Sequence, residues 1–112
     1  MTGNNSQNET TALILRDFEL IEPEKELNEA ELLVYLADAI AYMIEHKMDF
    51  LLSLLYRLDV AEPKINAALS PGNPEEAHVA LAKLVLERQK LRVATKQAYR
   101  AQNPTNWNWD ID

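Results

Sequence analysis

The densest apolar pattern in the chain runs from residue 32 to residue 60. Large apolar side chains recur there at the three- and four-residue spacing of one helical face. Lys47 falls at the centre of that face, where burial of an unpaired ammonium would be costly. The pattern therefore favours two antiparallel helices, near 29–46 and 49–60, with Asp49 as the N-cap of the second. One unbroken helix is the alternative, because no glycine or proline marks the break.

Local start signals fix where two of the main helices begin. Asn28 and Glu31 have the spacing of a capping box, which places the first turn of the earlier helix. An asparagine, a proline and a glutamate within residues 73–76 repeat this arrangement. They predict a third main helix over 74–101.

The remaining segments are shorter or more polar. The polar composition of residues 1–10 is typical of a disordered tail. Residues 12–21 are apolar enough to dock, as a short helix or alternatively as an extended arm, and a second short helix is expected over 63–69. The sequence thus predicts one helical domain over 11–101, followed by a tail over 102–112 that has no helical pattern.

These elements predict an all-α fold, a small antiparallel bundle of three main helices with one or two short ones. A chain of 112 residues is long enough for a single core. The apolar faces predict that this core includes Leu33, Leu36, Ile40, Phe50, Leu51, Leu54, Leu55, Leu58, Leu81 and Leu84.

Composition argues against most catalysis. The chain has no cysteine, which excludes disulfides and thiolate chemistry, and its two glycines leave no glycine-rich loop for a phosphate. No apolar run is long enough to span a bilayer, and the first ten residues lack the apolar segment of a signal peptide. We expect a cytoplasmic protein that is not an enzyme and carries no cofactor.

A metal site is the weakest of the functional hypotheses. Glu75 and His78 have the i, i+3 spacing of ligands in helix-bundle di-iron proteins, and Glu45, His46 and Asp49 are further donors. Such a site needs a second motif and two more inward glutamates. A carboxylate in a first helical turn is more simply explained by the helix dipole.

Charge is distributed unevenly along the chain. The net charge is −7, but residues 1–62 carry a surplus of −9 and residues 87–101 a surplus of +4. The basic stretch 88–100 suggests nucleic-acid binding as an alternative function. Seven acidic side chains between Glu9 and Glu29 favour pairing within the chain or with a protein partner instead.

The favoured function is protein–protein interaction, as an adaptor or regulatory module. The helix over 49–60 is apolar around most of its circumference, so Leu52 and Tyr56 are expected to remain uncovered and to form a homodimer interface. Trp107 and Trp109 form either a docking peptide or the last packed piece of the domain. The candidate interaction residues are Leu52, Tyr56, Arg88, Arg92, Trp107 and Trp109.

The expected dimer has an electrostatic component. The basic half of the third main helix of one subunit would lie against the acidic N-terminal half of its partner, a contact that salt weakens. The competing hypothesis is that the N-terminal arm and the tryptophan tail cover the same apolar patch within one chain.

Overall fold

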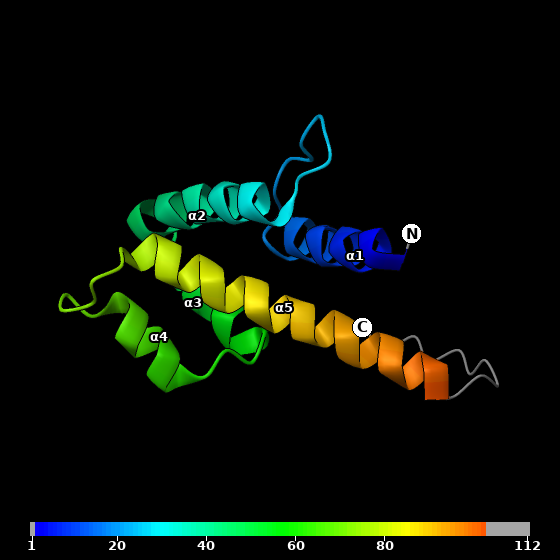
Figure 1. Cartoon of the computed structure of the whole chain (residues 1–112). Coiled ribbons are helices and arrows are strands. Elements are labelled where there is room, and N and C mark those ends of the chain that lie inside the picture. The colour runs from blue at the N-terminus through cyan, green and yellow to red at the C-terminus, as the bar shows by residue number, and fades with distance from the viewer. Residues whose placement is uncertain (1, 103–112) are drawn as a thin grey trace.

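Five helices make up the part of the chain that this computed structural model describes, residues 2–102 (Figure 1). They are α1 (Thr2–Asp17), α2 (Glu29–His46), α3 (Met48–Arg57), α4 (Glu62–Leu69) and α5 (Ala77–Gln102). No strand occurs within residues 2–102. The predicted all-α helical bundle is confirmed.

Helix α3 packs on α2, and the longest helix, α5, packs on the other elements. It contacts α1, α2 and α4. In Figure 1 α5 crosses the front of the molecule, with α1 and α2 along one side and α4 along the other. Its first half lies over the bundle and its second half extends past it beside α1.

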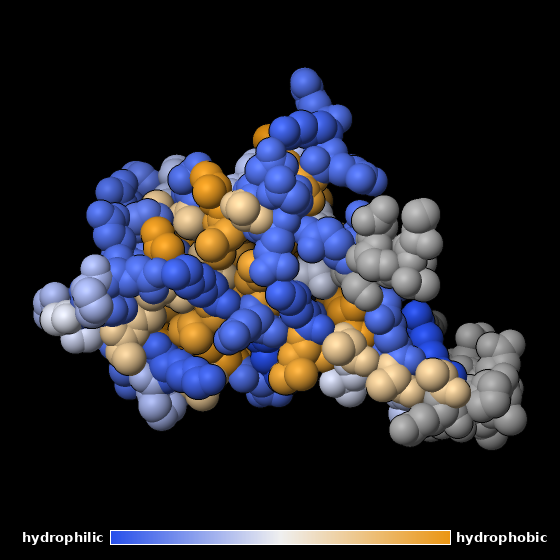
Figure 2. Space-filling model, viewed as in Figure 1, coloured by the Kyte–Doolittle hydropathy of each residue, from blue (hydrophilic) through white to orange (hydrophobic). Residues whose placement is uncertain are grey.

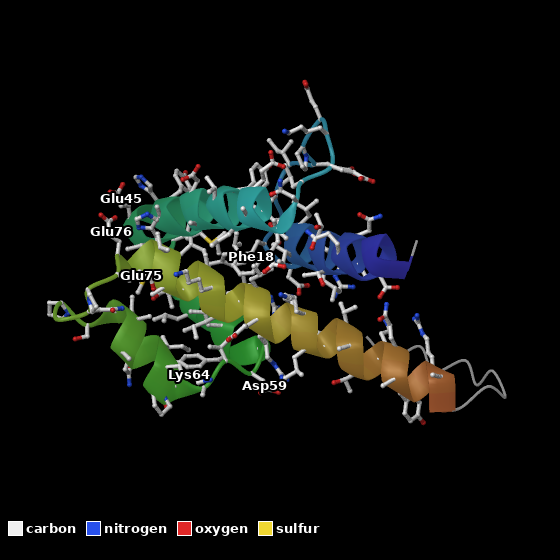
Figure 3. All side chains as sticks on the ribbon, in the orientation of Figure 1. Phe18, Glu45, Asp59, Lys64, Glu75 and Glu76 are labelled. Atoms are coloured by element: carbon white, nitrogen blue, oxygen red, sulfur yellow. The ribbon has the colours of Figure 1, made fainter. Side chains whose placement is uncertain are left out.

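One apolar core joins all five helices, and most of the predicted core residues are fully buried in it. Leu33, Phe50 and Leu84 pack against the core but are only partly buried. The prediction did not include Ile14 and Phe18, although both are fully buried. Figure 3 places Phe18 between the two long helices α2 and α5, well inside the molecule.

The start of α2 is built as the sequence predicts. The Asn28 side-chain oxygen accepts a hydrogen bond from the Glu31 backbone N–H (2.8 Å), and the Glu31 carboxylate accepts one from the Asn28 N–H (3.0 Å). The Asn28 N–H and the Lys25 ammonium together hold the pKa of the Glu31 carboxyl below its ordinary value. The capping box is confirmed.

The predicted break in the Leu-rich stretch is also confirmed. α2 ends at His46 and α3 begins at Met48, with the exposed Lys47 between them in a non-helical conformation (φ −144°, ψ 49°). The prediction that Asp49 caps α3 is wrong, because Asp49 lies inside its first turn. Lys47 is both the last capping position of α2 and the residue before α3. No separate residue therefore caps the start of α3.

The predicted start of α5 is wrong by three residues. The Asn73 side chain accepts a hydrogen bond from the Glu75 N–H (3.2 Å), which closes a tight turn two residues ahead. The helix itself begins at Ala77, and its first bond runs from the Ala80 N–H to the Glu76 carbonyl (2.9 Å). The asparagine therefore forms a local turn before the helix rather than capping it.

The N-terminal segment differs most from the prediction. Helix α1 covers Thr2–Asp17, whereas the sequence predicted a disordered tail over 1–10. Thr10 is buried, and the Gln7 side-chain amide donates to the Leu27 carbonyl (3.4 Å). The local composition of this segment gives no helical signal. The segment is nevertheless helical, and it contacts residues that are distant in the sequence. The residues after Asp17 leave the helix, and Ile21 is exposed rather than docked.

Candidate functional site

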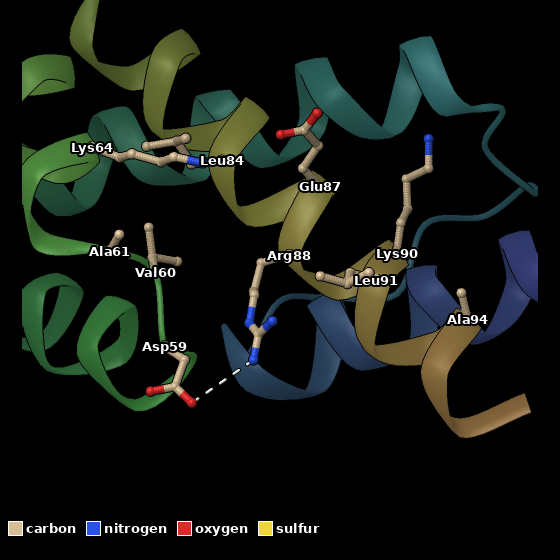
Figure 4. Close-up of a pocket in the computed structure, with 10 residues that line it drawn as sticks. All are labelled: Asp59, Val60, Ala61, Lys64, Leu84, Glu87, Arg88, Lys90, Leu91 and Ala94. Carbon is tan, nitrogen blue, oxygen red and sulfur yellow. Dashed lines mark ion pairs between the residues drawn. The ribbon is translucent and has the colours of Figure 1, made fainter. Parts of the chain in front are cut away.

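A groove lies between the end of α3, the start of α4 and the outer face of α5 (Figure 4). Its volume is about 670 Å³. Its lining residues are Asp59, Val60, Ala61, Lys64, Leu84, Glu87, Arg88, Lys90, Leu91 and Ala94.

One wall of the groove is formed by the way α3 ends. Asp59 has a left-handed backbone conformation (φ 65°), and the Val60 N–H bonds back to the Leu55 carbonyl (3.1 Å). The Asp59 N–H bonds to the Tyr56 carbonyl (3.1 Å), which completes a Schellman motif. This turn sends the chain away from α3 and leaves Val60 and Ala61 facing α5 across the groove.

The other wall is the outer face of α5. Leu84, Leu91, Ala94 and Ala98 are spaced so that they share one helical face. We call these four residues the α5 strip. In Figure 2 orange and pale-orange atoms run along the second half of α5 towards the lower right. Leu91 lines the groove and is 56% exposed, so this face of α5 is uncovered there.

Charged side chains of both signs rim this apolar surface, because Asp59 and Glu87 line it together with Lys64, Arg88 and Lys90. The Arg88 Nε donates to the Leu58 carbonyl (2.8 Å), and its guanidinium lies 3.8 Å from the Asp59 carboxylate. The Lys90 ammonium pairs with Glu29 (3.1 Å). Lys64 has no ion-pair partner among the described residues, so it offers a cation to a bound group.

A second hollow continues the groove along α4. It shares Lys64 and Leu84 with the first and has a volume of about 610 Å³. Ala67, Ala68 and Ala80 also line it. The concave surface therefore follows the contact between α4 and α5.

The two arginines predicted as interaction residues have different positions. Arg88 lines the groove, whereas Arg92 faces α1. Its guanidinium donates to the Gln89 side-chain oxygen (3.1 Å) and lies 3.8 Å from the Asp17 carboxylate. Gln89 is fully buried and donates to the same carboxylate (2.8 Å). Arg92 thus belongs to an internal network between α1 and α5.

The other predicted interaction residues do not join Arg88 in one site. Tyr56 is half exposed, and Leu52 is partly buried against the core. Neither lines the groove. Trp107 and Trp109 lie outside the described residues.

The basic stretch of α5 is paired largely with acidic groups of the same chain. Besides Lys90 with Glu29 and Arg92 with Asp17, the Arg100 guanidinium lies 3.9 Å from the Glu9 carboxylate. The acidic N-terminal segment therefore meets this stretch within one chain. The expected contact with a partner's acidic segment is not needed to explain these charges.

The candidate metal ligands do not lie together in one site. Glu75 pairs with Lys83, and His78 lies 3.6 Å from Glu76. His46 lies 3.7 Å from Glu45 at the end of α2, and Figure 3 shows Glu45 and Glu76 near the same end of the molecule. The described residues contain no group of three or more acidic or histidine side chains that could hold a metal ion.

Sequence reasoning missed the groove because its walls depend on tertiary contacts. Leu91 continues the apolar spacing of Leu84, and this pattern alone suggests burial. Asp59 gives a weak local signal, since aspartate tolerates left-handed backbone better than most residues. The exposure of the Leu91 side chain depends on where α4 and α1 lie relative to α5, which the sequence pattern does not give.

Comparison of the chain with protein-family models, curated proteins and solved structures found no match. Among the helices of residues 2–102, none combines the length and apolar content needed to cross a membrane.

Proposed function

We propose that this protein is a protein–protein interaction module of the cytoplasm, an adaptor or regulatory protein, whose α4–α5 groove binds an amphipathic segment of a partner. The observation that carries the proposal is the exposed Leu91 at the groove, where apolar walls adjoin charged side chains. A small, uncovered apolar surface with a charged rim is typical of a docking site.

The chemistry of the groove defines the class of partner. The α5 strip favours large apolar anchors, because its alanines leave room for a bulky side chain. Lys64, which has no ion-pair partner among the described residues, favours a carboxylate beside those anchors, whereas Arg88 already faces Asp59. We therefore expect an acidic segment with aromatic or branched apolar residues on one side.

Nucleic-acid binding is the alternative, and the internal pairing of α5 argues against it. A phosphate backbone would have to compete with Asp17, Glu29 and Glu9 for the cations that these carboxylates already hold. The metal-enzyme alternative ranks lower still, because Glu75 is paired with Lys83.

Self-association through Leu52 and Tyr56 is a separate prediction. The half-exposed Tyr56 supports it, whereas the partial burial of Leu52 reduces the apolar area available. Light scattering tests it: a dimer has twice the 12.8 kDa mass of the chain, and Leu52→Glu should return it to the monomer without loss of helix.

Binding of a designed peptide tests the groove. The probe is a fluorescently labelled helical peptide with leucines on one face and glutamates on its flanks, and its matched control carries lysines in place of the glutamates. We expect the acidic peptide to bind and Leu91→Glu to weaken binding at least tenfold, measured by fluorescence anisotropy. Val34→Glu is the control variant, because Val34 is 60% exposed on α2 and does not line the groove.

Equal binding of the acidic peptide to both variants would overturn the proposal. Preference for the basic peptide would also overturn it. A parallel titration with duplex DNA and with RNA at increasing salt measures the alternative function directly.

A further inference from the structure

The segment that follows α5 has the chemistry that the groove accepts. Residues 103–112 lie outside the described residues, and their sequence contains both tryptophans of the chain. From residue 106 onward apolar and polar residues alternate strictly: Trp107, Trp109 and Ile111 alternate with Asn106, Asn108, Asp110 and Asp112. In an extended segment this alternation places the apolar groups on one side and the carboxylates on the other.

We propose that residues 103–112 fold back along α5 and occupy the groove of their own chain, in competition with a partner. This inference rests on the proposed function, since it assigns a regulator to the same site. The tryptophans would contact the α5 strip, and an aspartate would approach Lys64, which has no ion-pair partner among the described residues.

The position at which α5 ends suits this return. Residue 102 follows Leu91 by roughly three helical turns, so the chain leaves the helix on the side of the α5 strip, ~16 Å from Leu91. Pro104 prevents the helix from continuing far beyond that point. The segment therefore starts beside the surface that it is proposed to cover.

The length of the segment also suits it. Extended chain spans at most about 3.3 Å per residue, so Trp109 can reach Leu91, ~16 Å from residue 102, with about two residues left to reverse the chain direction. Asp112 reaches at most ~33 Å, whereas Leu84, which lies beside Lys64 in the groove, is ~27 Å back along the helix. The segment is therefore long enough for a tryptophan to reach Leu91 and for its last carboxylate to approach Lys64.

Tethering gives the segment an advantage over a free partner. A short flexible connection produces an effective concentration in the millimolar range. A partner then binds only the fraction of molecules whose groove is open, and its apparent affinity falls by that fraction. The segment would therefore set the threshold at which the partner binds.

Tryptophan fluorescence tests the proposal on the full chain without a label. Both tryptophans lie in the segment, so the emission reports on it alone. We expect emission shifted to the blue of indole in water and protection from acrylamide quenching. Leu91→Glu or Ala94→Glu should remove the shift and raise the quenching constant several-fold, whereas Val34→Glu should change neither.

Two results would overturn the proposal. The first is an emission spectrum that matches the chain in denaturant or does not respond to Leu91→Glu and Ala94→Glu. The second is a blue shift that disappears on dilution, because it would assign the groove to the segment of a second copy. Circular dichroism verifies that both variants retain their helices.

Peptide binding separates this inference from the proposed function. The double variant Trp107→Ala/Trp109→Ala should bind the acidic peptide about tenfold more tightly than the natural chain. Equal affinity of the two chains, with Leu91→Glu still weakening binding, would reject the inference and leave the proposed function standing. No peptide binding by either chain, with the fluorescence shift present, would reject the proposed function and leave the segment as a packed part of the domain.

Discussion

Helices α1 and α2 both pack on α5, but different chemistry holds the two contacts. α2 contributes fully buried aliphatic side chains, among them Leu32, Leu36 and Ile40. α1 contributes fewer large apolar groups, Ile14 and the adjoining Phe18, and adds a polar network. The contact of α2 therefore depends on buried apolar area, whereas that of α1 also depends on specific hydrogen bonds and ion pairs.

The polar network of α1 has a defined centre. The Asp17 carboxylate accepts from the buried Gln89 amide and faces Arg92, and further along the helix Glu9 meets Gln97 (3.5 Å) and Arg100. Ion pairs at the surface are screened by salt, whereas apolar burial is not weakened in that way. We therefore expect high salt to weaken the contact of α1 with α5 more than that of α2.

The largest expected effect on stability comes from a substitution in the apolar contact between α2 and α5. Leu36→Ala should lower the free energy of unfolding by about 2–5 kcal/mol, because it removes a fully buried side chain and leaves a cavity. Urea denaturation measures the loss, with the exposed Val34→Ala as the control. A loss below about 0.5 kcal/mol would contradict the position of Leu36 in the core.

The next largest effect on stability is expected from a substitution in the polar network between α1 and α5. Asp17→Ala should cost about 1–3 kcal/mol, since it leaves the buried Gln89 amide without its acceptor. Hydrogen exchange should rise in α1 much more than in α2. The control is Asp38→Ala on the exposed face of α2. Equal acceleration in both helices would show that α1 does not open separately.

A smaller effect, of the opposite sign, is expected where α1 ends. Glu19 has a left-handed backbone conformation (φ 53°) that glycine adopts without steric cost. Glu19→Gly should therefore raise the free energy of unfolding by about 0.5–1 kcal/mol. Thermal denaturation measures it. The matched change Asp59→Gly should gain less, because it also removes the carboxylate that faces Arg88.

The smallest effect is the pH dependence of the α2 cap. The folded state lowers the pKa of Glu31, so its contribution is fully present above the pKa of the unfolded chain and is lost as pH falls through the lower folded value. The stability difference between the natural chain and Glu31→Gln should therefore shrink on acidification below about pH 4.3. A difference that stays constant down to pH 2 would contradict the cap's role.

Much of the bundle follows from local sequence alone. The capping box at Asn28 and the break at Lys47 are confirmed because each depends on residues that are neighbours in the chain. The apolar spacing of α2 and α3 likewise selects most of the core, since a helix fixes which side chains share a face. Of the groove, the sequence singled out Arg88 but not Leu91, Asp59 or Lys64.

Tertiary structure decided the rest. Nothing local predicts a helix over the polar residues 2–10, whose described side chains contact α5 and the loop before α2. The partners of Arg92 and Lys90 lie far away in sequence, at Asp17 and Glu29, so spacing cannot assign them. Leu91 repeats the apolar spacing of Leu84, yet it is exposed because none of the helices packed on α5 covers it. Helical periodicity determines which residues share a face, but only the arrangement of the other helices determines whether that face is covered.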